Sequence, residues 1–285
     1  MPVGVGPAQL AQLAPNARSS YREAFAAAQP VLDRYGIAQS GLRLAHFMAQ
    51  VLHESGALTV QFENLNYSAE RLPKVWPSRF KPKGPLDPAA YAHDPRKLAN
   101  EVYAGRMGNT GPDDGWAFRG RGLLQLTGRE SYAAATTFLR GDYPEAPDFT
   151  AEPDAVIAAE WCLRVAAVEW SAKGCNALAD KDAIVAVTRA INGGTIGLAE
   201  RRELFRQTGD AQAARKALAV FTGGSHSMFT DRLGTGGLEH NPRVKAATRE
   251  LALAFFDATL GGQTQALARW PERHRALLSD YQSTF

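Results

Sequence analysis

The sequence has no hydrophobic run long enough to cross a membrane. A spanning helix needs about 18 consecutive apolar residues, and no segment of the 285-residue chain approaches that length. The first residues, MPVGVGPAQLAQL, also lack the basic start and the continuous apolar core of a secretory signal. We therefore expect neither membrane insertion nor a signal peptide.

Cysteine and excess charge are also scarce. The two cysteines, Cys162 and Cys175, are too few for a disulfide framework and lack the spacing of metal ligands, and the sequence leaves open whether they pair. The net charge is only +3, which does not favour a nucleic-acid partner. That excess lies in residues 211–285, which hold 9 basic and 6 acidic residues, whereas residues 1–210 hold 23 of each. Hydrophobic residues make up 45% of the chain, which excludes a disordered protein.

Most of the chain has the apolar spacing of helices. The strongest signal is the segment GLRLAHFMAQVLHES, residues 41–55, whose apolar residues form one stripe between a potential N-cap at Ser40 and a closing glycine at Gly56. Similar spacing predicts helices over residues 8–13, 20–35, 154–173, 182–191, 198–208 and 242–260. The sequence therefore predicts a mainly helical fold.

Glycine and proline interrupt this helical pattern in the central part of the chain. Residues 73–95 contain seven prolines or glycines, which predicts a long surface loop. Residues 105–122 are glycine-rich and polar, which indicates an irregular or β-hairpin region. Next, Gln125 and Thr127 alternate with Leu124 and Leu126, so on a short strand the two polar side chains would share one face. We expect an α+β fold with one small β element.

Two glutamates, Glu54 and Glu63, are the clearest candidates for chemistry. Glu54 ends the predicted helix among apolar neighbours, so we expect its carboxyl group to be partly desolvated. Glu63 follows in the polar segment FENLNYS, where we expect more water. Hydrolysis of a glycosidic bond uses two carboxyl groups in unlike surroundings, one as proton donor and one as base. Two glutamates at this spacing are also commonly plain surface charges, so spacing alone does not decide.

Two further segments offer polar groups to a cleft. In GRGLLQLTGRESY, residues 120–132, the glycines permit close approach to a ligand, and Gln125 and Thr127 would face it unless the segment is a hairpin whose polar face meets water. Asn192 stands before two glycines at a predicted helix end. It is a turn residue by default, and as a functional residue it offers a side-chain amide.

Taken together, these segments resemble glycoside hydrolase family 19, the lysozyme-like chitinases, and in particular its bacterial and phage-type endolysin branch. The matching segments are FMAQVLHESG, FENLNYSAERL, YAGRMGNTGPDDGWAFRGRGLLQLTGRESY and INGGTIGLAERR. They occur in the order of the family, and the resemblance covers roughly residues 8–208. It implies a lysozyme-like α+β fold with a small β-hairpin element beside the catalytic cleft.

The resemblance also implies roles for individual residues. Glu54 matches the general acid and Glu63 the general base that activates a water molecule, and Thr127 matches a residue that helps to hold that water. The implied reaction is a single displacement with inversion at the anomeric carbon, for which the two carboxyl groups stand roughly 6.5–9.5 Å apart. The family's sugar-contacting amides match Gln125 and Asn192. No metal and no cofactor are implied.

Other positions either match the family or depart from it. Arg201 matches an arginine that orients the acid, whereas Ile196 stands where plant-type members carry a further glutamate. Leu123 likewise replaces a proline of the plant motif, and both departures favour the endolysin branch. His53 precedes the acid as in the family and is expected to be structural. The aromatic residues Tyr67 and Trp116 are candidates for stacking on sugar rings, although aromatic residues of helical domains more often lie in the core.

The tail, residues 213–285, lies beyond the usual end of the family. Its segments faintly resemble the last strand and helix of α/β-hydrolases, in which His226 would be a triad histidine. The chain has no G-x-S-x-G nucleophile motif, so we expect no hydrolase activity of that kind. The tail is expected to be either a packed extension or a cationic module that meets the anionic cell wall.

These observations predict an endo-acting, inverting glycoside hydrolase that cleaves β-1,4 linkages of bacterial peptidoglycan. The alternatives are a chitinase and a catalytically silent sugar-binding module, and loss of either glutamate would have favoured the latter. We expect a catalytic domain at residues 1–210 and a C-terminal extension at 211–285. The expected partner is the polysaccharide substrate, and we expect a monomer. Without a visible signal, the protein would be made in the cytoplasm and would reach the wall through a holin-type lesion or a secretion system, as an endolysin or a toxin delivered into rival cells.

Overall fold

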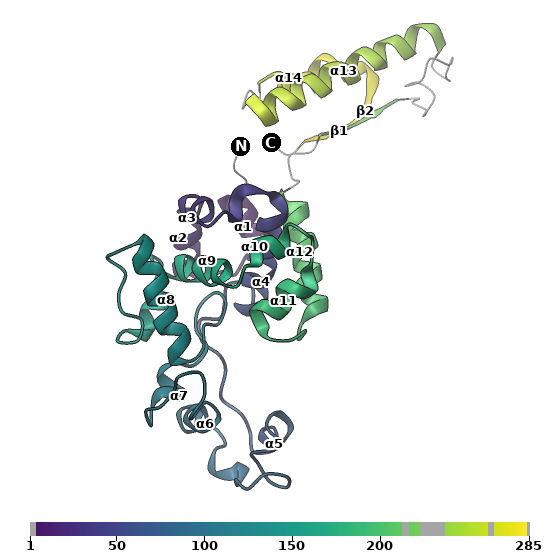
Figure 1. Cartoon of the computed structure of the whole chain (residues 1–285). Coiled ribbons are helices and arrows are strands. Elements are labelled where there is room, and N and C mark those ends of the chain that lie inside the picture. Colours follow the sequence, from purple (N-terminus) through teal and green to yellow (C-terminus); the bar gives the residue numbers. More distant parts are fainter. Residues whose placement is uncertain (1–3, 213–216, 223–236, 262–264, 284–285) are drawn as a thin grey trace. The chain divides into compact units, whose positions relative to one another are not determined.

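The computed structural model describes residues 4–212, 217–222, 237–261 and 265–283. The chain forms two compact units, Pro2–Ala211 and Gln212–Phe285. Both are mainly helical, as the sequence predicts (Figure 1). No helix among the described residues is long and apolar enough to cross a membrane.

The first unit is built from helices and short 3₁₀ turns. Its α-helices are α1 (Pro7–Leu13), α2 (Ser19–Ala26), α3 (Gln29–Arg34), α4 (Gly41–Glu54), α5 (Leu72–Val75), α6 (Pro95–Val102), α7 (Asp114–Ala117), α8 (Arg129–Asp142), α9 (Cys162–Ala172), α10 (Cys175–Ala179), α11 (Ile184–Asn192) and α12 (Leu198–Gln212). Its 3₁₀ helices are η1 (Ile37–Gln39), η2 (Pro88–Ala90) and η3 (Pro153–Ile157). The predicted helix over 20–35 is in fact two helices, α2 and α3, because Pro30 in the first turn of α3 starts a new helix.

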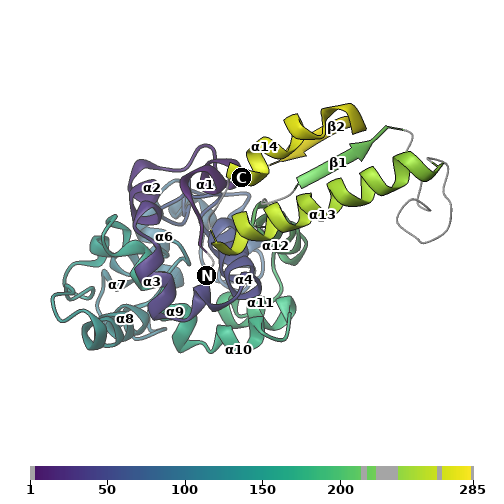
Figure 2. The same cartoon turned by 90° about the horizontal axis from the view of Figure 1, so that it is seen from above.

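Helix α4 lies within the main core and carries Glu54 at its last position. The Ser40 hydroxyl accepts a hydrogen bond from the Arg43 amide at 3.1 Å, which confirms the predicted N-cap. Every residue from Leu44 to Leu52 is buried, and α10 and α11 pack against the helix (Figure 2). Gly56 follows with φ +53°, a conformation that glycine adopts at little cost. Burial on all sides fixes the position of Glu54.

Helix α9 forms a second element of this core. Trp170 is fully buried, and its indole N–H donates to the Asn176 side chain at 2.8 Å. The ring also packs edge-on against Phe47 of α4, with centroids 5.4 Å apart. Cys162 and Cys175 are both buried and free, so the question that the sequence left open is answered against a disulfide bond.

The segment between α4 and α8 contains a separate small core. Its buried members are Leu65, Leu72, Phe80, Leu98, Ala99 and Val102, and Tyr67, Trp76, Leu86, Tyr91, Tyr103 and Trp116 pack against it. The prediction that residues 73–95 form a surface loop is therefore wrong in part: α5 and η2 lie in or beside this segment, and Phe80 is fully buried. Prolines and glycines predict turns, but their number does not reveal that these turns enclose a buried aromatic ring.

The predicted β element takes a minimal form. Phe62 pairs with Arg121 and Arg121 with Leu126 as isolated antiparallel bridges, rather than as extended strands. Residues 123–125 form a turn in which Gln125 has φ +56°. The prediction of a strand there is therefore wrong: Leu124 and Leu126 alternate with polar residues as in a strand, but a tight turn buries them together with Leu123.

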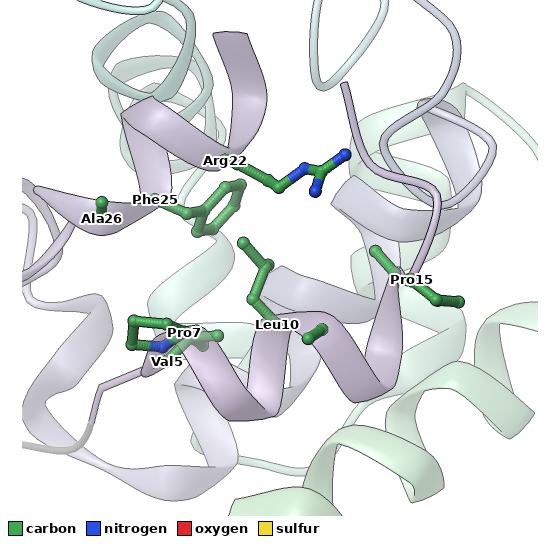
Figure 3. Close-up of a pocket in the computed structure, with 9 residues that line it drawn as sticks. Val5, Pro7, Leu10, Pro15, Arg22, Phe25 and Ala26 are labelled. Atoms are coloured by element: carbon green, nitrogen blue, oxygen red, sulfur yellow. The ribbon is translucent and has the colours of Figure 1, made fainter. Parts of the chain in front are cut away.

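An apolar pocket of about 100 Å³ lies between α1 and α2. Figure 3 shows Leu10 of α1 and Phe25 of α2 pointing toward each other across it. The one charged side chain among its lining residues, Arg22, donates to the Ala17 carbonyl at 2.8 Å. The pocket therefore offers no pair of acid and base groups.

The second unit contains β1 (Ala217–Phe221), α13 (Gly237–Gly261), α14 (Gln265–Arg273), a 3₁₀ turn at Arg275–Leu277, and β2 (Leu278–Ser283). Strands β1 and β2 are antiparallel, with Ala219 opposite Tyr281. Trp270 is buried here, donates to the Ala247 carbonyl at 2.9 Å and lies 5.5 Å from the Tyr281 ring. The sequence predicts helix α13, as a helix over 242–260, but not α14 or β2. His226 lies outside the described residues.

Candidate active site

Glu54 is bound to a buried arginine from a distant part of the sequence. Its Oε1 accepts a hydrogen bond from Arg201 Nη2 at 2.5 Å. The Glu54 side chain is 14% exposed and that of Arg201 is fully buried. The expectation of a partly desolvated carboxyl group is thus confirmed, and Arg201 is placed where it can orient that group.

Arg201 is itself held on three sides. Its Nη1 donates to Gln50 Oε1 at 2.5 Å, and its Nε donates to the Ile196 carbonyl at 3.3 Å. Gln50 lies one helical turn before Glu54 on α4, so the guanidinium group bridges two residues of the same helix face. A buried charge needs such partners. Sequence reasoning missed Gln50, although a polar residue four positions before Glu54 in an apolar segment was a usable signal.

His53 packs against the loop that leads into α12. A Cβ atom at Gly197 would lie 2.2 Å from His53 Cε1, so the close approach requires glycine, which here has φ +70°. Burial lowers the pKa of His53, and the Arg201 charge lowers it further. The neutral imidazole therefore serves as a packing surface for this loop.

Glu63 is held by two neutral donors. The Gly120 amide donates to Glu63 Oε1 at 2.6 Å, and the Tyr103 hydroxyl donates to Oε2 at 2.7 Å. The Glu63 amide in turn donates to the Gly120 carbonyl at 3.0 Å, beside the bridge between Phe62 and Arg121. Among the described residues, Glu63 is thus held by neutral hydrogen-bond donors, whereas a buried guanidinium group binds Glu54. Tyr103 was not identified from the sequence.

Gln125 and Thr127 meet Glu63 around Gly120. A Cβ atom at Gly120 would lie 3.1 Å from Gln125 Oε1, 3.3 Å from Thr127 Oγ1 and 3.3 Å from Glu63 Cβ. The Thr127 hydroxyl donates to the Gln125 carbonyl at 2.7 Å, which leaves its oxygen lone pairs to accept from a water molecule. The two polar side chains do share one side, through a turn rather than through a strand.

Three other predicted site residues are Asn192, Tyr67 and Trp116. No interaction found among the described residues joins them to the two carboxyl groups. Asn192 is exposed at the end of α11, before Gly193 with φ +77°. Tyr67 packs edge-on against Trp76 at 5.2 Å, and Trp116 lies under the Arg119 guanidinium at 3.6 Å. Both aromatic rings are half-buried against the small core, so packing accounts for part of each surface.

No protein-family model matches the chain. A curated protein from Haemophilus influenzae, described as a glycosyl hydrolase family 19 domain-containing protein, is 40% identical over 167 residues, which are 58% of this chain and 78% of that protein. The chain belongs to glycosyl hydrolase family 19. It is therefore a glycoside hydrolase, and the family predicted from the four sequence segments is confirmed.

Solved structures of family 19 enzymes are also similar to this chain. Chitinase C from Streptomyces griseus is 19% identical with a TM-score of 0.48, over 73% of this chain and 92% of that one. A bacterial family 19 chitinase matches with the same identity, TM-score and share of this chain, over 94% of its own length.

Proposed function

We propose that this family 19 enzyme hydrolyses β-1,4 linkages within peptidoglycan by single displacement, with Glu54 as general acid and Glu63 as general base. The observation that carries the proposal is that fixed donors hold both carboxyl groups in place, a buried guanidinium for Glu54 and the Tyr103 hydroxyl and Gly120 amide for Glu63. An inverting glycosidase needs two positioned carboxyl groups of this kind, one as proton donor and one as base.

In the proposed reaction, Glu54 gives its proton to the glycosidic oxygen as the bond to the anomeric carbon breaks. Glu63 takes a proton from a water molecule, whose oxygen attacks the opposite face of that carbon. The product has the inverted configuration, and no covalent enzyme intermediate forms. Arg201 then faces the newly charged Glu54 carboxylate, and a fixed positive charge stabilises the charge that develops there.

Two observations favour peptidoglycan over chitin. Ile196 replaces the glutamate of plant-type members, and Arg201 binds its main-chain carbonyl instead of a second carboxylate. In addition, the Arg119 guanidinium lies over the rings of Phe62 and Trp116, at 4.7 and 3.6 Å, immediately before Gly120. Among the described residues its one hydrogen-bond acceptor is the Trp116 carbonyl, at 2.8 Å, so other N–H groups remain for a ligand. Arginine suits carboxylates, which the peptides of peptidoglycan carry and chitin lacks.

The proposal is tested by mass spectrometry of soluble products released from purified sacculi and from colloidal chitin. We expect muropeptides from sacculi with the wild-type protein, and a loss of 10²–10⁴-fold with Glu54→Gln, since that is the typical contribution of a general acid. Glutamine retains an oxygen that accepts from Arg201, so the fold should persist, as circular dichroism can verify. Glu145→Gln, at an exposed position, is the matched control.

Each alternative outcome has a definite meaning. Chito-oligomers from chitin, with nothing from sacculi, would move the enzyme to the chitinases. Binding to sacculi without any product would favour the silent sugar-binding module. More than about a tenth of wild-type activity in Glu54→Gln would overturn the assignment of the acid.

A further inference from the structure

We propose that Tyr103 is a positioning residue for the base, Glu63, and that the enzyme relies on its hydroxyl group to aim that carboxylate at the attacking water. The inference rests on the proposed function. Its basis is the pair of short hydrogen bonds that hold the carboxylate, from the Tyr103 hydroxyl at 2.7 Å and from the Gly120 amide at 2.6 Å. Bonds of this kind to a charged oxygen are among the strongest in proteins.

Both the backbone and the ring of Tyr103 are held in place by neighbouring groups. Its amide donates to the Ala99 carbonyl at 3.0 Å at the end of α6, and its carbonyl accepts from Asn109 Nδ2 at 3.1 Å. Asn109 is buried and in turn accepts from the Arg129 amide at 2.9 Å. The ring itself packs against the small core that contains Phe80. The hydroxyl group therefore has little freedom to move away from Glu63.

The Tyr103 hydroxyl keeps its proton and donates it to the hydrogen bond with Glu63. Burial raises the pKa of Tyr103 well above its ordinary value, and the nearby negative charge of Glu63 raises it further. The other charged and titratable groups that act on this pair are Tyr67, Arg106 and Arg119. Because the phenol keeps its proton, it cannot replace Glu63 as the base.

The geometry explains how one carboxylate can be both held and reactive. Each carboxylate oxygen has two lone pairs, and the hydrogen bonds from Tyr103 and Gly120 use one on each oxygen. A second lone pair remains to accept the proton of the water. Without the phenol donor, the carboxylate is held on one oxygen alone and can turn about its terminal bond, which lowers the fraction of molecules in reactive geometry.

The test is Tyr103→Phe, which keeps the ring and removes only the hydroxyl group. Kinetics are measured on a soluble oligosaccharide that the wild-type enzyme cleaves. We expect kcat to fall about tenfold or more with KM changed less than about twofold, since the variant loses orientation rather than binding. The acidic limb of the pH–rate profile should move to higher pH, because a donor that stabilises the charged form of the base is lost. The matched control is Tyr91→Phe, whose hydroxyl donates to the non-catalytic Glu101 at 3.4 Å beside the same small core.

A double-mutant cycle separates positioning from direct contact with the substrate. If Tyr103 acts through Glu63, adding Tyr103→Phe to Glu63→Gln should lower the residual rate less than about twofold. Three results would each overturn the inference. They are a double variant in which the rate losses of the two single variants multiply, an unchanged kcat in Tyr103→Phe, and a loss of kcat in Tyr91→Phe equal to that in Tyr103→Phe. A fully active Glu63→Gln would instead overturn the proposed function, so the two failures are distinguishable.

Discussion

We predict that the buried carboxyl group of Glu169 makes the free energy of unfolding of this enzyme depend on pH. The residue lies on α9 beside a cavity of about 160 Å³ lined largely by apolar side chains, and its side chain is 15% exposed. Lys173 Nζ lies 3.7 Å from Oε1, whereas Oε2 is buried without a hydrogen-bond partner among the described residues. Burial raises the pKa of Glu169 from its ordinary 4.5 to about 7, with Lys173 opposing this and Glu54 adding to it.

The raised pKa of Glu169 decides whether the free energy of unfolding rises or falls with pH. Below pH 4.5 both the folded and the unfolded chain hold the Glu169 proton. Between pH 4.5 and about 7 the folded protein still holds a proton that the unfolded chain has released, so the free energy of unfolding falls by about 1.4 kcal/mol per pH unit. Above about pH 7 the folded and the unfolded chain have both released this proton, so Glu169 no longer changes the free energy of unfolding as the pH rises. The total loss is about 3 kcal/mol.

The prediction is checked by urea unfolding of the wild type and Glu169→Gln between pH 4.5 and pH 8, followed by tryptophan fluorescence. The wild type should lose about 3 kcal/mol relative to the variant over this range, because glutamine has no proton to release. Comparing the two proteins cancels the opposite contribution of His46 and His53, whose pKa values burial lowers. Glu160→Gln, with a side chain 59% exposed, is the control and should follow the wild type. A difference between wild type and Glu169→Gln that stays constant within about 0.5 kcal/mol would refute the reasoning.

Two further predictions concern the arginines of the site. Arg201→Met should lower the free energy of unfolding by about 3–5 kcal/mol, because Gln50, Glu54 and the Ile196 carbonyl lose the buried donor that they share. A loss below about 1 kcal/mol in urea unfolding at pH 7 would show that these hydrogen bonds do not form in solution. Arg119→Gln should slow cleavage of sacculi about tenfold and leave cleavage of chito-oligosaccharides within about twofold, if Arg119 binds carboxylates of the peptide. Equal loss on both substrates would contradict that role.

Residues with local signals were predictable, and residues joined by long-range packing were not. Helix α4 and its N-cap at Ser40 follow from neighbours within four positions, so the sequence predicts them correctly. Tyr103 and Gly120 lie 40 and 57 positions from Glu63, and no periodicity connects them. The turn at Gln125 was missed for a related reason. Alternating leucines look like a strand, whereas burial of those leucines around a turn gives the same pattern.

By itself, the sequence determined the mainly helical character of the chain and its family, and it singled out Glu54 and Glu63 as candidate catalytic carboxyl groups. These properties depend on residue types, their order and their short-range spacing. The tertiary structure decided what holds each carboxyl group: a buried guanidinium 147 positions away for Glu54, and a phenol and a backbone amide for Glu63. The physical reason is that the surroundings of a charged group depend on how distant segments pack, and only the folded chain brings those donors within hydrogen-bond distance.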